Sequence, residues 1–309
     1  MRRILPDRLP RRTRGFNLIE LVISIVVTGI VVAGLAYFVF PVRQAADIAA
    51  RADLTDIADT ALQRIGRDVR LALPNSVRTT ASSGAVFVEF LAVRTAGRYR
   101  GEGGGAAGGT NCPNDDPSLA PPDNDQLSFD SVADSCFKTI GPLPDANTVV
   151  AGNDYLVLNN YGPGFSGQDA YSPGPPANRA LISAIDYTSE VNRSRVAFAA
   201  TTFQRTLHDS PGRRFFIISG PVSYVCDPVL GSITRYWGYP IAAAQPTTFG
   251  AGSSAVIATK VSACDFDYAP NIAPQIGLLT LRLTLSAPTS SGVAETVSLY
   301  HAIHVNNVP

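Results

Sequence analysis

A run of 25 residues, 16–40, carries only one charged side chain, Glu20, and this run constrains the chain more than any other feature. A helix of this length extends about 37 Å, and the hydrocarbon core of a bilayer requires about 20 apolar residues. Residues 1–15 contain six arginines and a single acid, Asp7, so the positive-inside rule places the N-terminal end in the cytoplasm. The sequence therefore predicts a membrane-spanning helix, with the rest of the chain exported.

The apolar run is longer than the centre of a removable secretory signal, and no small-x-small cleavage site follows it at Phe40-Pro41-Val42, so we expect it to be retained. A carboxylate at the centre of a membrane helix costs about 2.5–3.5 kcal/mol, and less near the interface. Cleavage after Gly15 would create an α-amine on Phe16, which could pair with Glu20 of a staggered neighbouring helix. A monomeric anchor with Glu20 at the lipid interface is the alternative.

A second helical pattern follows the apolar run. Small and apolar residues recur every three or four positions and form one stripe, while polar residues occupy the opposite side. Pro74 and Asn75 end the pattern, because the residue before a proline is driven out of helical geometry. The sequence predicts a single helix over about 16–73, with Pro41 as the place where it could kink. The stripe consists of Leu54, Ala58, Ala61, Ile65, Val69 and Ala72.

After Ser76 the sequence has the character of a β-rich domain, with short runs of β-branched and aromatic residues. Residues 85–93 are mostly apolar, as expected of a strand buried on both faces. Residues 277–285 alternate between apolar and polar, and a turn-rich connection joins them to a partner strand at 293–305. The predicted fold class is α+β, with a long helix packed on an antiparallel sheet. Further strands are predicted at 155–159, 195–200, 214–220, 222–225 and 233–239, and long loops at 95–125 and 160–179.

The charge distribution argues against nucleic-acid binding. The formal net charge is zero, and without residues 1–15 there remain 19 basic and 24 acidic side chains, a net charge of −5. Nucleic-acid binding requires a basic surface, and none is evident beyond the N-terminal segment.

The four cysteines, Cys112, Cys136, Cys226 and Cys264, lie far apart and include no CxxC pair. A zinc site usually draws on such short spacings, so two disulfides in an oxidising compartment fit better. Three pairings are possible. We favour Cys112–Cys136 and Cys226–Cys264, because each closes a local loop, and four reduced core thiols are the alternative.

No motif predicts catalysis, a cofactor or a metal. The segment GGGAAG at 103–108 matches the dinucleotide pattern GxGxxG, but no helix follows it, so we expect a loop. His301 and His304 fall on opposite faces of a strand and cannot bind one metal ion there without a bulge. The neighbours His208-Asp209-Ser210 do not converge from separate elements as a catalytic triad requires, and a turn is expected.

Two further segments have one structural and one functional interpretation each. The Asp- and Asn-rich residues of 114–125 could bind calcium through oxygen atoms, but they lack the EF-hand pattern, and a solvated loop is favoured. Trp237 could be a platform for stacking a sugar, but an aromatic of the core or of an interface is favoured.

The segment R-G-F-N-L-I-E-L at 14–21 resembles the type IV prepilin processing site, usually written G-F-T-L-I-E, with Asn17 in place of the usual threonine. Basic residues precede it and a long apolar helix follows, as in that family. The resemblance implies that a prepilin peptidase cuts between Gly15 and Phe16 and methylates the new N-terminus of Phe16. It also implies that the carboxylate of Glu20 pairs with the N-terminus of a neighbouring subunit during assembly.

Four blocks further along the chain together resemble the MshO-type minor pilins of the MSHA pilus system, and the first also resembles pseudopilins of the PilW and GspJ kind. The blocks are RIGRDVRLALPNSVR (64–78), CDPVLGSITRYWGYPI (226–241), KVSACDFDY (260–268) and HAIHVNNVP (301–309). The resemblance implies a type IV pilin fold divided into a cleaved leader (1–15), a transmembrane assembly helix (16–40), an amphipathic periplasmic helix (41–74) and a globular domain (75–309).

On this resemblance the protein would be a minor pilin or pilus assembly factor that primes or caps the filament, without enzymatic activity or a cofactor. Its partners would be other pilins, the prepilin peptidase, the inner-membrane assembly platform and the lipid bilayer. It would reside in the inner membrane and then in the pilus fibre at the cell surface. Three alternatives remain: a type II secretion pseudopilin; a tip adhesin that binds glycans through the two long loops or Trp237; and a membrane-anchored periplasmic enzyme.

Overall fold

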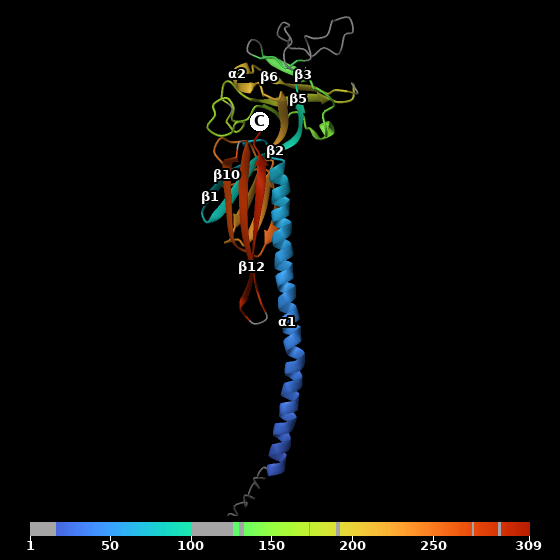
Figure 1. Cartoon of the computed structure of the whole chain (residues 1–309), viewed down its shortest axis with the longest axis vertical. Helices are drawn as coiled ribbons and strands as arrows, with labels where there is room; N and C mark the ends of the chain where they lie inside the picture. Colours follow the sequence, from blue (N-terminus) through green and yellow to red (C-terminus); the bar gives the residue numbers. More distant parts are fainter. Residues whose placement is uncertain are drawn as a thin grey trace, which may run out of the picture.

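The fold is α+β, as the sequence predicts, and consists of one long helix, α1, docked on antiparallel sheets (Figure 1). It is known from a computed structural model. The first half of α1 extends far beyond the body of the protein, and the second half lies against it. The structure describes residues 17–100, 126–129, 133–172, 174–189, 192–273, 275–289 and 292–309.

Helix α1 spans Leu18–Arg70 and continues through Pro41 without a break. It ends three residues before the predicted end at position 73. The chain leaves the helix there because its backbone pairs with a strand: the N–H of Leu73 donates to the carbonyl of Leu91 at 2.8 Å, and Ala72 forms an isolated bridge with Ala92. The end of α1 is therefore set by the register of the sheet, and this register cannot be predicted from the helical pattern in the sequence.

In the part of the chain that the structure describes, twelve strands form two sheets. A nine-stranded sheet has the order β1-β2-β7-β4-β5-β6-β3, with β8 paired to β7 and β9 paired to β8; a three-stranded sheet has the order β10-β11-β12. The strands are β1 (Arg78–Ser82), β2 (Ala85–Arg98), β3 (Asp134–Lys138), β4 (Tyr155–Leu158), β5 (Arg179–Asp186), β6 (Arg195–Thr201), β7 (Arg214–Asp227), β8 (Ser232–Trp237), β9 (Ser253–Thr259), β10 (Val261–Ala273), β11 (Ile276–Pro288) and β12 (Ala294–Asn306). Short helical turns occur at η1 (Ala146–Thr148) and α2 (Arg205–His208).

Strand β7 divides the body into two lobes. Its first half pairs with β4 and its second half with β8, while β2 runs along its other side throughout. Gly220 lies between the halves with φ +117°, a conformation that side chains disfavour, and β2 has register shifts opposite it, between Ala92 and Thr95. We call the part with the end of α1, β1 and β8–β12 the proximal lobe, and the part with β3–β6 and α2 the distal lobe.

The core of the proximal lobe lies between the two sheets and the second half of α1. The alternation predicted in β11 is present, because its four alternate leucines are fully buried and its polar residues point the other way. The predicted partner strand is β12, which pairs with β11 along its whole length. The buried leucines are Leu279, Leu281, Leu283 and Leu285.

The distal lobe has a separate core of aromatic and aliphatic side chains, with Phe137 and Phe215 packed edge to face at its centre. The loop predicted at 95–125 is wrong for its first residues, because residues 95–98 continue β2 and pair with β7; residues 101–125 lie outside the described residues. The described residues of 160–178 are irregular, as predicted, and β5 begins at Arg179. Ala170 and Tyr171 are buried between the lobes, whereas residues 163–166 are exposed.

Candidate assembly site

The first part of α1 is apolar on all sides and has no protein around it. Within the described residues, Leu18–Phe38 is the one stretch long and apolar enough to cross a membrane, and none of it is buried in the body. A helix that is apolar all round requires an apolar environment, which lipid or neighbouring helices can supply. This part of the helix is therefore a surface for lipid and for other subunits rather than for its own body.

Glu20 lies in the first turn of α1 and is exposed. An acid in this position interacts favourably with the positive end of the helix dipole. Among the described residues its carboxylate has no hydrogen-bond or ion-pair partner, and Ser24 donates only to its backbone carbonyl, at 2.8 Å. Gly15 and Phe16 lie outside the described residues, so cleavage and methylation at that position stay predictions.

Small residues on the same helix leave room for a partner. A Cβ atom added at Gly29 or at Gly34 would have no atom within 4 Å. Helix association in membranes favours such positions, because they let two backbones approach closely. The apolar half of α1 thus combines a carboxylate that has no partner among the described residues with surfaces suited to close helix packing.

The second half of α1 is docked on the proximal lobe by its predicted stripe. Five of the six residues are fully buried, and Ala72 is partly buried against the same core. Gly66 lies under the ring of His301, whose Nε2 would be 3.1 Å from an added Cβ. The fully buried stripe residues are Leu54, Ala58, Ala61, Ile65 and Val69.

Polar contacts fix the register of α1 against the sheets. Near the end of the helix, the carboxylate of Asp68 accepts hydrogen bonds from the hydroxyl of Tyr224 at 2.7 Å and from Nε of Arg235 at 2.9 Å. Burial and this contact raise the pKa of Tyr224 above its ordinary value. Nearer the N-terminus of the helix, the carboxylate of Asp53 pairs at 2.6 Å with the ammonium group of Lys260, which lies in the turn between β9 and β10.

The end of α1 is also joined to residues far along the chain. The backbone N–H of Asn75 donates to Oδ1 of Asn307 at 3.1 Å, and its side-chain amide donates to the carbonyls of Asn160 and Asn307. The side-chain amide of Asn307 in turn donates to the hydroxyl of Tyr268 and to the carbonyl of Pro270. These contacts connect α1, both sheets and the segment between the lobes.

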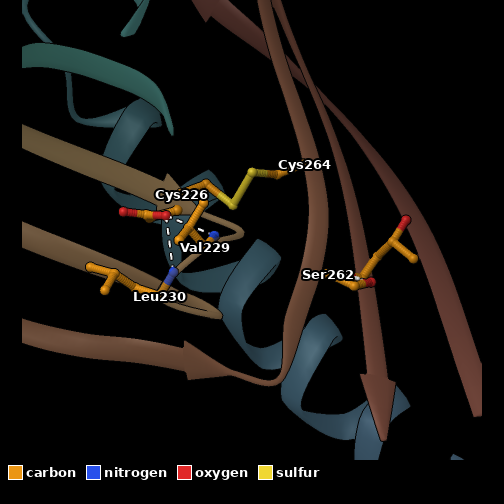
Figure 2. Close-up of a disulfide and its surroundings, with 7 residues drawn as sticks. Cys226, Val229, Leu230, Ser262 and Cys264 are labelled. Atoms are coloured by element: carbon orange, nitrogen blue, oxygen red, sulfur yellow. Dashed lines mark hydrogen bonds between the residues drawn. A yellow bond between two sulfur atoms is a disulfide. The ribbon is translucent and has the colours of Figure 1, made fainter. Parts of the chain in front are cut away.

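A disulfide joins Cys226 and Cys264, as predicted, and thereby links β7 of the large sheet to β10 of the small one (Figure 2). Its two Cα atoms are 6.4 Å apart. Cys136 is not a free thiol, but Cys112 lies outside the described residues, so the pairing of these two stays a prediction.

Replacing Cys226 and Cys264 by serine is expected to lower the free energy of unfolding by about 2–4 kcal/mol, because the bond closes a long loop in the unfolded chain. Urea denaturation of the oxidised double variant and the wild-type chain, in the same detergent, measures this. Adding a reductant should bring the two proteins to nearly the same stability, because the wild-type chain then loses this bond as well. Equal stability of the two proteins before reduction would contradict the assignment of a stabilising crosslink.

Sequence reasoning missed a buried charged cluster on the outer face of the large sheet. Glu89 of β2 is fully buried and pairs with Arg78 of β1 at 2.6 Å; it also accepts hydrogen bonds from the hydroxyls of Ser223 and Tyr239. Burial raises the pKa of Glu89 above its ordinary value, against the opposing effect of Arg78. One signal in the sequence could have revealed this cluster: Glu89 lies within residues 85–93, a run that is predicted to be a strand buried on both faces.

Arg78 connects this cluster to two loops. Its guanidinium donates to the carbonyls of Ala242 and Ala243 and lies 3.6 Å from the centre of the Tyr171 ring. Every polar group of the cluster therefore has a partner, and the arrangement holds the segment after β8 and the segment between the lobes on the sheet.

The motifs weighed in the sequence have structural roles where the structure describes them. His301 packs on α1 and His304 is exposed on the other face of β12, as predicted. His208 ends helix α2, which corrects the predicted turn; its Nδ1 accepts from the N–H of Gln204, and its Nε2 lies 2.8 Å from the carbonyl of Gly167. This histidine is buried and is not part of a triad.

The favoured interpretation of Trp237 is confirmed, since it packs against the proximal core. Within the described residues no group of three or more His, Cys, Asp or Glu side chains could hold a metal ion. The segments 103–108 and 114–125 lie outside the described residues, so the interpretations of the glycine cluster and of the Asp- and Asn-rich stretch stay predictions.

Residues 10–36 match the family described as the prokaryotic N-terminal methylation motif. The match covers the predicted processing site, Glu20 and most of the apolar run, so the chain has a type IV prepilin-like N-terminus. No curated protein and no solved structure gives a significant match to the chain.

Proposed function

We propose that this chain, which begins with a type IV prepilin-like N-terminus, is a minor pilin or assembly factor of an MSHA-type type IV pilus. After leader cleavage, the apolar half of α1 holds the subunit in the inner membrane until it is extracted into the helical bundle of the filament. The subunit then primes or caps the filament. It acts through assembly and not through catalysis, and it requires no cofactor.

The observation that carries the proposal is Glu20, a carboxylate without a partner among the described residues, on the half of α1 that is otherwise apolar all round. An unpaired charge in an apolar bundle is costly, and a free α-amine on Phe16 of the next subunit would supply the missing cation. Within one helix the two groups, four residues apart, are poorly placed to meet. Between staggered helices they can meet, so the arrangement favours a subunit that assembles.

The finer assignment rests on the size of the body and on the four blocks that resemble MshO-type minor pilins. Residues 75–309 form a body of about 235 residues, which is large for the main subunit of a filament and suits a low-copy position. A type II secretion pseudopilin is the closest other candidate. Deleting the gene should abolish pili and leave protein secretion intact; the reverse result would favour the pseudopilin.

The N-terminus of the mature protein tests the proposal most directly. Mass spectrometry of the chain purified from membranes should find a protein that begins at Phe16 and carries one additional methyl group. Replacing Gly15 by alanine should leave the full precursor, including residues 1–15, because a glycine before the cut is part of the motif that the resemblance identifies. An intact Met1 in the wild-type protein, or a cut after residue 40, would contradict the pilin assignment.

A further inference from the structure

The outer face of the large sheet in the proximal lobe carries a groove of about 450 Å³, within the range of about 300–1,000 Å³ typical of small-molecule sites. Its floor consists of successive cross-strand pairs. Phe87 of β2 lies opposite Val225 of β7, which lies opposite Thr234 of β8; on the next row Asp227 lies opposite Ser232. The groove therefore runs across three neighbouring strands.

A segment between β8 and β9 forms the wall of the groove. Phe249 from this segment stacks on Tyr236 of β8, with ring centres 4.2 Å apart and planes 11° apart. The same segment is held at Ala242 and Ala243 by the guanidinium of Arg78, which is itself paired to Glu89. The wall is thus fixed to the sheet before any ligand arrives, and preorganisation of this kind favours binding.

The chemistry of the lining is that of a site for a neutral, hydroxyl-rich ligand. Hydroxyl groups of serine, threonine and tyrosine side chains surround the rings of Phe87 and Phe249. Among the described residues that line the groove the one charged side chain is Asp227, whose Oδ1 already accepts from the backbone N–H groups of Val229 and Leu230. There is no lysine, arginine or histidine to select a phosphate or another anion. Hydroxyls that can donate or accept, beside aromatic faces, suit a sugar, which has polar edges and an apolar ring face.

The groove is separate from the surface that assembly requires. None of its lining residues belongs to α1. Alternate residues of a strand point to opposite faces, and Tyr224 and Arg235, which contact Asp68 of α1, point away from the groove. Packing of α1 helices into a bundle therefore does not use the residues that line the groove.

We propose that this groove binds a neutral saccharide, in the size range of a mono- or disaccharide or of the end of a longer glycan. Tyr236 and Phe249 supply the stacking surface, and the hydroxyls along β8 and the wall supply hydrogen bonds. From the sequence alone, Trp237 is a candidate platform for stacking a sugar. Trp237 faces the core, and its neighbour Tyr236 lines the groove instead. The inference does not depend on the kind of filament, and its failure would leave the assembly role unaffected.

The test uses the full mature chain in a detergent without sugar groups, because alkyl glycosides would compete for the site. Saturation-transfer difference NMR is recorded with lactose, maltose and cellobiose, and with 3′-sialyllactose as the anionic counterpart of lactose. We expect ring protons of at least one neutral disaccharide to receive saturation. Phe249→Ala should weaken that binding about tenfold by removing the stacked ring.

Two further variants keep the test decisive. Thr234→Phe fills the floor of the groove without replacing any wall residue and should abolish binding. Tyr300→Ala removes an exposed ring on β12, outside the groove, and should bind as the wild type does. Melting temperatures establish that the variants fold. The proposal is wrong if none of the three neutral sugars binds, if Phe249→Ala and Thr234→Phe bind normally, or if 3′-sialyllactose binds more tightly than lactose.

Discussion

Replacing Glu20 by alanine is expected to leave leader cleavage intact while reducing incorporation into filaments by about 100-fold or more. Removing one member of a buried ion pair costs about 3–5 kcal/mol, because the other charge stays in an apolar environment without a partner. Each 1.4 kcal/mol corresponds to about a tenfold change in an equilibrium constant. In the proposed filament the abandoned charge is the α-amine of a neighbouring Phe16.

Quantitative immunoblotting of sheared filaments against membranes measures incorporation, and the mass of the mature chain measures cleavage. Glu20→Gln keeps the size of the side chain and should show the same defect, which separates charge from shape. Asp59→Ala is the matched control, because Asp59 is an exposed acid on the side of α1 that faces away from the sheets. Normal incorporation of both Glu20 variants would exclude a pairing role for this carboxylate.

The second large effect is expected from Arg78→Ala, which should lower the free energy of unfolding by about 3–5 kcal/mol at neutral pH. The substitution leaves Glu89 fully buried without its cation and releases the carbonyls of Ala242 and Ala243. Chemical denaturation of the full chain in detergent, followed by near-ultraviolet circular dichroism, measures the loss.

The pH dependence of this variant follows from the raised pKa of Glu89. Its folded-state pKa lies above the unfolded value, so folding is favoured with the proton bound, and stability falls as the pH rises from about 4.5 through the folded pKa. Without Arg78 the pKa rises further, so the deficit of the variant should be smaller at pH 4 than at pH 7. The double variant Arg78→Met, Glu89→Leu removes both charges and should recover much of the stability. A deficit that is the same at both pH values would count against a buried, unpaired Glu89.

The sequence was sufficient to predict the long helix, the α+β class and most of the strands, because these depend on local periodicity. The buried stripe on α1 and the alternating leucines of β11 are direct readings of the periods 3.6 and 2. The end of α1 was predicted three residues too late, since pairing of Leu73 with Leu91 depends on tertiary register. The two-lobe arrangement was not predicted, because it arises from strand β7 pairing with different partners along its length.

The blocks that carry the resemblance to MshO-type minor pilins meet one another in the structure. The first block supplies Asp68 and Asn75, the second supplies Arg235, and the last supplies Asn307. The disulfide joins the second block to the third, through Cys226 and Cys264. These segments therefore dock the helix on the body.

The candidate sites were predictable to different degrees. Glu20 could be recognised from the sequence alone, because it is the only charged residue in the apolar run 16–40. The groove was not, since its floor takes residues from three separate strands, β2, β7 and β8, and its wall comes from the segment around Phe249. Only strand pairing brings these positions together, and no spacing rule within one segment describes that pairing.

The contact between Asn75 and Asn307 has a consequence for the time course of biogenesis. The two residues are 232 positions apart, and β12, which covers much of the α1 stripe, lies at a similar distance along the chain. At about 5–20 residues per second of synthesis, roughly 10–50 s separate the emergence of the two partners. Throughout that interval the apolar stripe of α1 lacks β12, the strand that contacts the helix most, so the nascent chain exposes apolar surface that is prone to aggregation.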